Sequence, residues 1–385
     1  MPDTATGNTF SAEAFELPPQ QTRLQEFWNQ LRKNPLALMG LVIFLVFLVI
    51  ALTGRLLTFG TSPLLDPSMV RLQEKLRPPL SRPNMESLLP EEMPPMGAYL
   101  LGTDELGRDV FARMLQGAWV SLSVGFVAVG IAVFIGILLG GLAGYYGQNP
   151  IRVGEVFIAV LVIWLALGWG KLSTLILVVL ALAAIAIAVV LVVQRDSDSR
   201  GLLHVFSAEF LSVDMVITGL IDIMLCFPSF FLILTVVALL PASIYNIMIV
   251  IGITSWMGAA RFVRAEFLSL REQDFVAAAR ALGVSDWRII FRHMVPNAIA
   301  PVLVSATIGI AGAILTEAGL SFLGFGVPPP DATWGNILSD GKNYLFDAPW
   351  LTFIPGIAIL VVVLSFNLFG EGLRDILNPK LRERH

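Results

Sequence analysis

The chain has 385 residues, of which 56% are apolar and only 14% are charged, and its mean hydropathy is +0.77. Soluble domains carry about 25% charged residues, so this composition excludes an ordinary soluble enzyme and a disordered chain. One Cys and three His exclude a disulfide framework and a zinc cluster built by this chain alone. A net charge of −4 offers no basic surface for nucleic acid. We therefore expect an integral membrane protein.

The first membrane span follows a polar and acidic N-terminal segment, which lacks the basic start of a cleaved signal peptide. Residues 35–52 then form an apolar run without charge. A hydrocarbon core of about 30 Å requires roughly 20 helical residues. We predict a cytoplasmic tail at 1–34, a retained transmembrane anchor at 35–57 and an external loop at 58–116.

Seven further apolar blocks bring the prediction to about eight spans, each of them helical because backbone groups in lipid must be paired within their own segment. They lie at about 117–146, 156–168, 172–193, 213–240, 245–257, 298–315 and 350–369. The first of these blocks is rich in glycine, which lets helices approach closely. Pro228 removes a backbone hydrogen bond and is expected to kink the block that contains it.

The two blocks inside residues 152–212 are predicted to cross the membrane together as a hairpin. Arg152 precedes the pair, and Arg195 and Arg200 follow it, so both ends are expected on one side. An even number of crossings leaves the orientation of the rest of the chain unchanged. The remainder of 117–373 is expected to form one membrane domain, followed by a cytoplasmic tail at 374–385.

Basic residues set the orientation of the spans. Six Arg lie within 261–292 and four basic residues within 374–384, whereas 321–349 holds one Lys against three Asp. The basic residues of the loop at 58–116 oppose this assignment, but acidic residues accompany them and the loop is near the length limit of the rule. We predict that both termini and the Arg-rich loop are cytoplasmic.

The Arg-rich loop at 265–296 carries the most information. Its first half has an apolar helical stripe, and Gly283 follows as a residue able to end a helix. Ser285 and Asp286 suit the start of a second helix, which Pro296 is expected to close before the next span. The stripe of the first half consists of Phe267, Leu270, Phe275, Ala278, Ala279 and Leu282, and that of the second of Trp287, Ile290, Phe291, Met294 and Val295.

The pattern predicts a helix–glycine–helix elbow that is held by its apolar stripe and presents polar groups outward. On periodicity alone, a basic amphipathic loop lying on anionic lipid fits equally well. A resemblance favours the elbow. The segment resembles the EAA loop of ABC importer permeases, in which Glu-Ala-Ala is followed after three residues by Gly and nine residues later by Ile-x-Leu-Pro. Matching positions are Ala278, Ala279, Gly283 and Pro296, and the departures are Ala277, His293 and Val295.

Further stretches resemble the C-type permease subunit of dipeptide, oligopeptide and nickel importers. They are residues 30–44, 101–126, 317–341 and 370–382. The resemblance implies an all-α polytopic membrane protein with a type I ABC importer transmembrane domain, a MetI-like helical bundle, in a bacterial inner membrane. That family usually has six spans, so the hairpin at 152–212 is an addition.

The resemblance also implies a transport mechanism and its partners. The chain would join a second permease, two ATPase subunits that bind ATP and Mg, and an external substrate-binding protein, and would itself bind no cofactor. The elbow would transmit ATPase closure to the bundle, with Gly283 setting its bend and Trp287, Ile290 and Phe291 anchoring its second helix. The predicted coupling residues are Ala277, Ala278, Ala279, Gly283, Ser285, Asp286, Trp287, Arg288, Arg292 and Pro296.

Polar residues inside the spans are candidates for lining a solute pathway, because charged and polar groups in a membrane usually face protein or water. For Asp222 a helix-packing role is the alternative, and for Glu317 a pairing with Arg or a capping role. The candidates are Asp222, Asn246, Ser255, Asn297 and Glu317. The loop at 321–349 is interpreted as a rigid outer cap, as a docking surface for the binding protein, or as both.

Two other classes of function remain open at this point. The sequence lacks the G-x-x-x-x-G-K-[ST] phosphate loop, so an energised importer needs its ATPase from another polypeptide. A secondary transporter driven by an ion gradient is the main alternative, and a membrane scaffold that transports nothing is the other. The solute, which includes peptides and nickel chelates among its candidates, cannot be determined from this chain.

Overall fold

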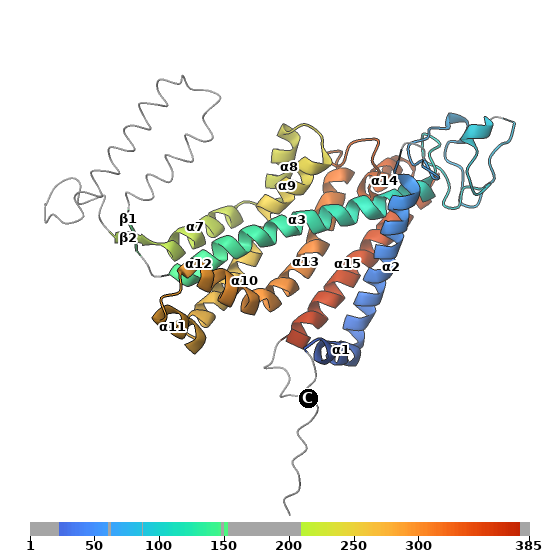
Figure 1. Ribbon diagram of the computed structural model, residues 1–385. Coiled ribbons are helices and arrows are strands. Elements are labelled where there is room, and N and C mark those ends of the chain that lie inside the picture. The colour runs from blue at the N-terminus through green and yellow to red at the C-terminus, as the bar shows by residue number, and fades with distance from the viewer. Residues whose placement is uncertain (1–22, 61–62, 87, 148–149, 153–208, 378–385) are drawn as a thin grey trace, which may run out of the picture.

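A computed structural model describes residues 23–60, 63–86, 88–147, 150–152 and 209–377 (Figure 1). Within these residues the chain is helical apart from one short strand pair and several loops. The longer helices are α1 (Arg23–Lys33), α2 (Pro35–Thr58), α3 (Val110–Tyr146), α7 (Val213–Cys226), α8 (Ser229–Leu239), α9 (Ile244–Thr254), α10 (Trp256–Arg271), α11 (Asp274–Ala281), α13 (Val295–Phe322), α14 (Trp334–Gly341) and α15 (Trp350–Leu377). The short elements are α12 (Asp286–Arg288), the π-helical turn Ile289–Met294, the 3-10 turns Leu72–Glu74, Pro90–Glu92 and Lys342–Tyr344, and the strands β1 (Pro150–Arg152) and β2 (Glu209–Ser212).

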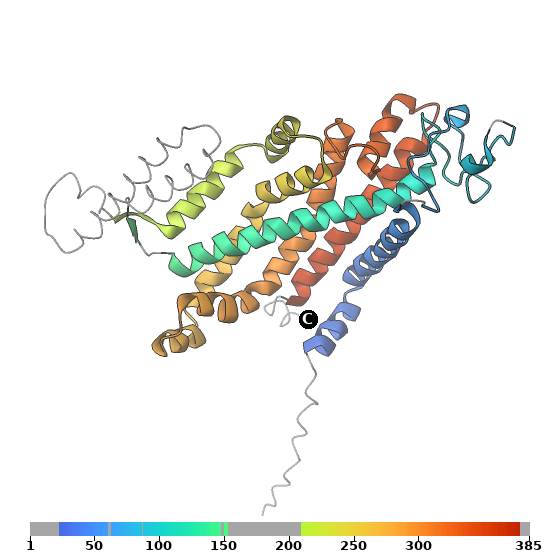
Figure 2. The same cartoon turned by 45° about the horizontal axis from the view of Figure 1, so that its top comes forward.

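Helix α3 is the central element of the bundle. It packs against α2, α7, α9, α10 and α13, and Figure 2 shows it running obliquely across the other helices. Its first residue is Val110, seven residues before the predicted start of this span, because the Asp109 carboxylate caps the helix by accepting a hydrogen bond from the Phe111 amide at 2.8 Å. The loop predicted at 58–116 correspondingly ends at Asp109.

The described part of the chain contains five helices that are long and apolar enough to cross a membrane, and one bent pair that would make a sixth. The five are α2, α3, Ile244–Arg271, Asp286–Phe322 and α15. Six of the eight predicted spans therefore have a helical counterpart, and the predicted spans at 156–168 and 172–193 lie outside the described residues.

The predicted span at 213–240 is broken rather than gently kinked. Its two halves, α7 and α8, meet at an angle of 82°. Phe227 is extended (φ −91°, ψ 133°) immediately before Pro228, because the proline ring excludes the helical conformation from the residue that precedes it. The single kinked helix predicted from the sequence is thus two helices.

Strands β1 and β2 bring the two ends of the 152–212 segment together. They pair antiparallel, with Pro150 opposite Ser212 and Ile151 opposite Leu211. The chain therefore leaves and rejoins the described bundle at one place, as an insertion with both ends on the same side requires. The predicted hairpin between the strands lies outside the described residues.

Small residues allow α3 and α10 to pack closely. A Cβ on Gly136 would lie 2.5 Å from the Ala259 Cβ, and a Cβ on Gly140 would meet the Ala260 carbonyl oxygen. Both contacts are too short for a side chain, so the glycines let the two backbones touch. The prediction that glycines permit close helix approach is confirmed for these two residues. Gly130 of the same helix has no such role, because a Cβ on it would meet no atom within 4 Å.

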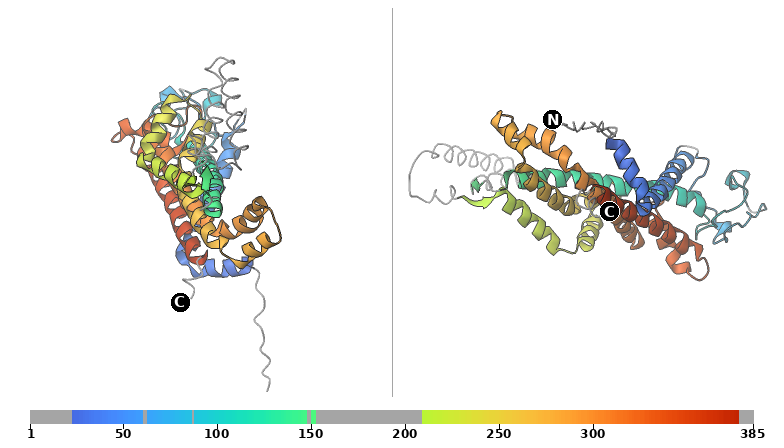
Figure 3. Two further views of the ribbon diagram at one scale, coloured as in Figure 1. Left: turned by 90° about the vertical axis from the view of Figure 1, so that its left-hand side faces the viewer. Right: turned by 90° about the horizontal axis from the view of Figure 1, so that it is seen from below.

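The two ends of the helical layer differ in shape. Figure 3 shows α11 and α12 projecting from one end of the layer as a separate arm. At the other end α14 packs on α3, α13 and α15, and Trp334 is buried with its indole N–H donating to the Met114 carbonyl oxygen at 3.2 Å. The arm coincides with the elbow predicted at 265–296.

Candidate functional site

The elbow begins with a break that the sequence pattern did not indicate. Helix α10 ends at Arg271 and α11 starts at Asp274, so the apolar residues of the first half belong to two helices with different directions. A stripe extrapolated through the break is therefore wrong. Val276, which lay off the predicted stripe, is fully buried, whereas Phe275 and Leu282, which lay on it, are exposed.

Gly283 ends α11 as predicted. Its φ of +71° is in the left-handed region that favours glycine. The Gly283 amide donates to the Arg280 carbonyl oxygen at 2.9 Å, and the Val284 amide donates to the Ala279 carbonyl oxygen at 3.1 Å. These two bonds form a complete Schellman motif. The backbone of the bend is therefore fixed by its own hydrogen bonds.

The second helix of the elbow starts at Asp286, but its cap differs from the prediction. The Ser285 side chain makes no capping hydrogen bond. The Asp286 carboxylate instead accepts from the Tyr145 hydroxyl at 2.6 Å and from the Tyr146 hydroxyl at 3.2 Å. Arg280 lies over the Tyr145 ring, 4.9 Å from its centroid. The elbow is thus tied to the last turn of α3 by one carboxylate and two tyrosines.

Pro296 does not close the second helix. Helical structure continues from Asp286 to Phe322, with Pro296 as the second residue of α13, where a missing N–H is tolerated. The preceding turn is π-helical, and the Val295 amide donates to the Ile290 carbonyl oxygen five residues back. The Asn297 side chain donates to the His293 carbonyl oxygen at 2.6 Å.

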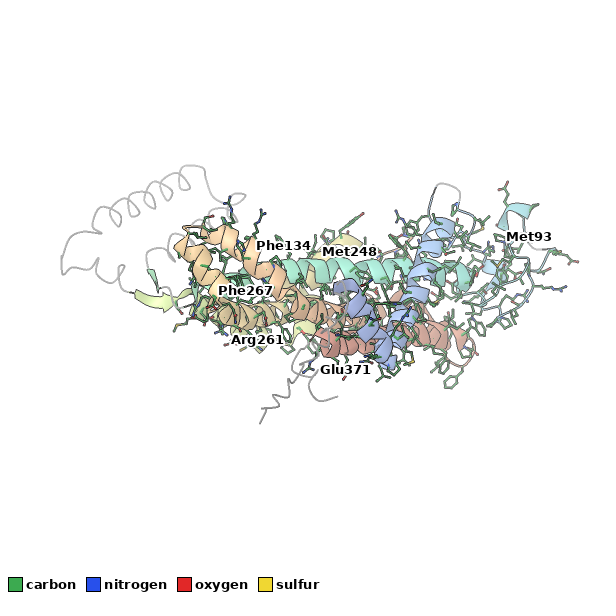
Figure 4. The ribbon with its side chains drawn as sticks, turned by 60° about the horizontal axis from the view of Figure 1, so that its bottom comes forward. Met93, Phe134, Met248, Arg261, Phe267 and Glu371 are labelled. Atoms are coloured by element: carbon green, nitrogen blue, oxygen red, sulfur yellow. The ribbon has the colours of Figure 1, made fainter. Side chains whose placement is uncertain are left out.

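The buried face of the elbow is apolar and continuous with the bundle. Ile289, Ile290 and Met294 are buried in one cluster with Val276 and Phe267, and Phe267 is labelled in Figure 4. Ile290, predicted as an anchor of the second helix, lies on this buried face. Val276 and Ile289 were not among the predicted stripe residues, because the break before α11 and the π turn decide which residues face inward.

The outer face of the elbow carries exposed apolar side chains beside the polar groups expected there, which include Arg288 and Arg292. Trp287 and Phe291 were predicted as anchors, yet they are 59% and 45% exposed, and their rings contact each other at a centroid distance of 4.7 Å. Leu282, beside the bend, is 82% exposed. Of the ten predicted coupling residues, only Ala279 is buried.

The five candidate pathway residues do not converge on one site. Glu317 is fully buried, where it accepts hydrogen bonds from Ser321 at 2.6 Å and Ser121 at 3.4 Å, and has no Arg partner among the described residues. Asn246 donates to the Pro241 carbonyl oxygen at 2.8 Å in the loop before α9. The pathway candidates Asn297 and Ser255 are exposed, at the start of α13 and before α10 respectively.

Asp222 has a partner that the sequence analysis placed elsewhere. Its carboxylate forms an ion pair with Arg261 at 3.0 Å, and both side chains are more than half exposed. Arg261 was assigned to the cytoplasmic loop because the span before it was expected to end at Met257, but the helical span continues to Arg271. Only Gly258, Ala259 and Ala260 separate Met257 from Arg261, and the clue available in the sequence was the absence of a proline or a polar turn residue among them.

Charged residues close the opposite end of the bundle. Arg113, at the start of α3, donates to Asp104 at 2.5 Å and to Asp340 at 2.8 Å, and Arg108 also pairs with both carboxylates. A pocket of about 300 Å³ lies beside this network, lined in part by Asp331 and the prolines 328–330. Burial raises the pKa of the Asp331 carboxyl and raises the pKa of the nearby Tyr99 phenol to about 12.

Residues 205–383 match the family described as binding-protein-dependent transport system inner membrane component. Residues 22–79 match the N-terminal transmembrane domain of oligopeptide transport permease C. Together the two matches cover α1 and α2 and all the helices from α7 to α15, the elbow included.

Curated relatives are similar over most of their length. The dipeptide transport system permease protein DppC of Alkalihalophilus pseudofirmus is 36% identical over 93% of this chain and 90% of the relative. The Haemophilus influenzae protein of the same name is 32% identical over 94% of this chain and 97% of the relative. The oligopeptide transport system permease protein OppC of Bacillus subtilis is 29% identical over 91% of this chain and 88% of the relative.

Proposed function

We propose that this chain, which belongs to the family of binding-protein-dependent transport system inner membrane components, is one permease subunit of an ATP-driven importer that takes up peptides. The similar relatives from three organisms are named for dipeptide or oligopeptide transport, which supports peptides as the solute. A nickel chelate as the solute stays an untested prediction. A second permease, two ATPase subunits and an external binding protein complete the proposed complex.

The arrangement of the two ends of the bundle supports a cytoplasmic elbow. In Figure 1, α1, the C-terminal end of α15 and the elbow helix α11 lie toward one side of the bundle, and α14 lies toward the other. Arg280, Arg288 and Arg292 lie on the elbow, and basic loops are retained on the cytoplasmic side. The proposed orientation therefore has both termini and the elbow inside the cell, and the network around Arg113 outside.

The exposed apolar face of the elbow is the observation that carries the proposed function. Leu282, Trp287 and Phe291 are large and exposed, although the buried face of the same elbow is packed into the bundle. Large apolar side chains surrounded by Arg are typical of the centre of a protein–protein interface. We propose that an ATPase subunit covers this face.

The proposed coupling requires that the elbow moves as one unit with the bundle. The Schellman motif at Gly283 fixes the bend, and the hydrogen bonds from Tyr145 and Tyr146 to Asp286 join the elbow to α3. When the ATPase pair closes on ATP, the elbow would displace the cytoplasmic end of α3 and so move the bundle from an inward-open to an outward-open state. A loop lying on lipid would have no need of this fixed geometry.

Only two of the five candidate pathway residues are still proposed to line the solute pathway. Asp222 and Ser255 are exposed on the bundle surface and remain in it. Glu317 is enclosed within this chain, and Asn246 and Asn297 each donate to a nearby backbone carbonyl, so these three act in packing. The pocket beside Arg113 is the proposed contact for the binding protein, and its rigid walls are compatible with a capping role as well.

Replacing Leu282 by Glu tests the interface with the ATPase. An exposed leucine contributes little to the fold, so the variant should reach the membrane normally. If Leu282 is central to the interface, association with the ATPase subunits should weaken by about 2 kcal/mol, roughly thirtyfold. The measurement is the amount of ATPase that co-purifies with the complete complex, together with the ATP hydrolysis stimulated by the binding protein.

Leu239→Glu is the matched control, because Leu239 is also 82% exposed but lies at the end of α8, away from the elbow. It should leave ATPase association unchanged. Wild-type ATPase binding by the Leu282 variant would contradict the proposal. If that variant instead lost only its affinity for anionic vesicles, the elbow would be a lipid-binding loop.

A further inference from the structure

Two ion pairs with very different surroundings join α7 to α10. The pair of Asp214 with Arg264 is formed by two hydrogen bonds, one of them from the Arg264 Nη2 to the Asp214 Oδ2 at 2.6 Å. The pair of Asp222 with Arg261 is formed by one, from the Arg261 Nη2 to the Asp222 Oδ1 at 3.0 Å. The first pair is bidentate and holds the helices together, and the second is held at a single point.

Arg261 has unused hydrogen-bonding capacity. A guanidinium has five N–H donors, and the bond to Asp222 is the only one that Arg261 makes to the described residues. Its side chain is 55% exposed and that of Asp222 is 62% exposed, whereas Arg264 and Asp214 are 31% and 25% exposed. The outward-facing donors of Arg261 are therefore available to another acceptor.

The position of Arg261 within its span makes contact with lipid unfavourable. It lies ten residues before the end of the 28-residue segment Ile244–Arg271, which corresponds to about 15 Å along a helix. Because this segment, at about 42 Å, is longer than the roughly 30 Å hydrocarbon core, Arg261 lies within the core but toward one edge of it. Charged side chains at such positions usually face protein or a water-filled cavity. In Figure 4, Arg261 lies on the opposite side of the helical layer from the exposed Phe134.

Small side chains lie beside Arg261 on α10, where Gly258, Ala265 and Ser269 are exposed. Phe262 and the half-buried Leu268 are the larger residues near it on this helix, and Leu225 of α7, three residues after Asp222, is also exposed. A Cβ on Gly258 would meet no atom within 4 Å. This face of α10 therefore has room for a polar solute beside the guanidinium.

We propose that Arg261 binds the terminal carboxylate of the transported peptide, and that Asp222 occupies the guanidinium when no peptide is present. The inference rests on the proposed peptide import and adds a solute-binding residue to it. A guanidinium binds a carboxylate through two parallel hydrogen bonds. The incoming carboxylate replaces the single bond to Asp222, so one acceptor is exchanged for another and no proton needs to move.

Asp222 makes the site reversible. If Arg261 had no internal partner, it would be an unpaired charge inside the span after the peptide leaves, which is unfavourable. With Asp222 beside it, the guanidinium has an acceptor before and after each transport event. The exchange also keeps the site from binding the peptide too tightly to release it.

The test compares a peptide that has a free C-terminal carboxylate with the same peptide as a C-terminal amide. Uptake is measured in the complete complex, at concentrations that saturate the binding protein with each peptide. Arg261→Gln should reduce uptake of the acid about tenfold, the value expected for one lost charge-assisted hydrogen bond, and leave uptake of the amide unchanged. Arg271→Gln is the matched control on the same helix, where Arg271 pairs with the exposed Glu272, and should affect neither peptide.

Two further variants separate binding from packing. In a Cys226→Ser background, Gly258→Cys, which keeps Arg261 and has open space around the added atom, should react with a membrane-impermeant thiol reagent, and the acid peptide should protect it. Asp222→Asn should bind the acid peptide more tightly and slow its release, because Arg261 remains charged and has lost the carboxylate that competes with the peptide; unchanged release of the acid peptide would contradict the exchange.

The inference would be overturned by equal loss of acid and amide uptake in Arg261→Gln, or by unaltered uptake of both. Loss of the second permease from the purified Arg261 variant would also overturn it, since Arg261 would then be a subunit contact. Failure of the wild-type complex to import any peptide would overturn the proposed substrate class, and is distinguishable because it requires no variant.

Discussion

The two ends of α3 are built on opposite principles. At its first turns Arg113 is buried between Asp104 and Asp340, so charged groups are paired with one another inside this chain. At its last turn Tyr145 and Tyr146 bind Asp286 of the elbow, whose outward face is apolar and exposed. One end satisfies its groups internally, and the other leaves surface that another protein would cover.

Substitutions at the first end should therefore change the stability of this subunit, whereas substitutions at the second end should change its association with other subunits. Breaking a buried, internally paired network removes stability from the isolated subunit, because a buried charge loses part of its pairing. Changing an exposed surface alters association instead and leaves the subunit folded.

Arg113→Met should give the largest effect, a loss of about 3 kcal/mol in the free energy of unfolding, because two charge-assisted bonds are lost and the buried Asp104 keeps only Arg108 as its cationic partner among the described residues. The measurement is thermal or denaturant unfolding of the isolated subunit in detergent. Arg271→Met removes an ion pair whose partner Glu272 is 73% exposed, and should cost less than about 1 kcal/mol. Similar losses in the two variants would remove the distinction between the ends.

Gly140→Ala should cost about 1–3 kcal/mol, because the added methyl group meets the Ala260 backbone and forces α3 away from α10. Membrane abundance and unfolding in detergent measure the effect. Gly130→Ala is the control on the same helix, with open space around the added atom, and should be neutral or slightly stabilising. An equally harmless Gly140 variant would mean that α3 and α10 are not packed backbone to backbone.

Tyr145→Phe and Asp286→Asn should change stability least, by about 1 kcal/mol each, since the first removes one hydrogen bond to Asp286 and the second weakens the two that Asp286 accepts from Tyr145 and Tyr146. Their larger effect is expected on coupling, as reduced stimulation of ATP hydrolysis by the binding protein with basal hydrolysis retained. In a double-mutant cycle the two changes should be non-additive, because the residues share one bond. Tyr245→Phe, at an exposed tyrosine at the start of α9, is the control. Additive effects of the Tyr145 and Asp286 changes would contradict the proposed connection between the elbow and α3.

The sequence by itself determined the membrane class, six spans of the described bundle and the position of the elbow. Long apolar runs predict membrane helices reliably, because lipid offers no hydrogen-bond partners. A single segment that crosses the membrane must therefore pair its backbone groups within a helix. The role of Gly283 in ending a helix was also predictable from the sequence, since the left-handed φ at such a position favours the one residue without a Cβ. These features depend on local chemistry, which a sequence displays directly.

Only the tertiary structure decided which faces of those helices are used. The break before α11 and the π turn at Ile289–Met294 change the helical register, so Ile289 turns inward while Trp287 and Phe291 turn outward. Similarly, Arg261 became a partner of Asp222 because α10 extends past the apolar block. The spacing of apolar residues predicts which side chains face inward only while the helix is regular. Beyond each irregular turn, the side chains that face inward are determined by packing against other parts of the chain.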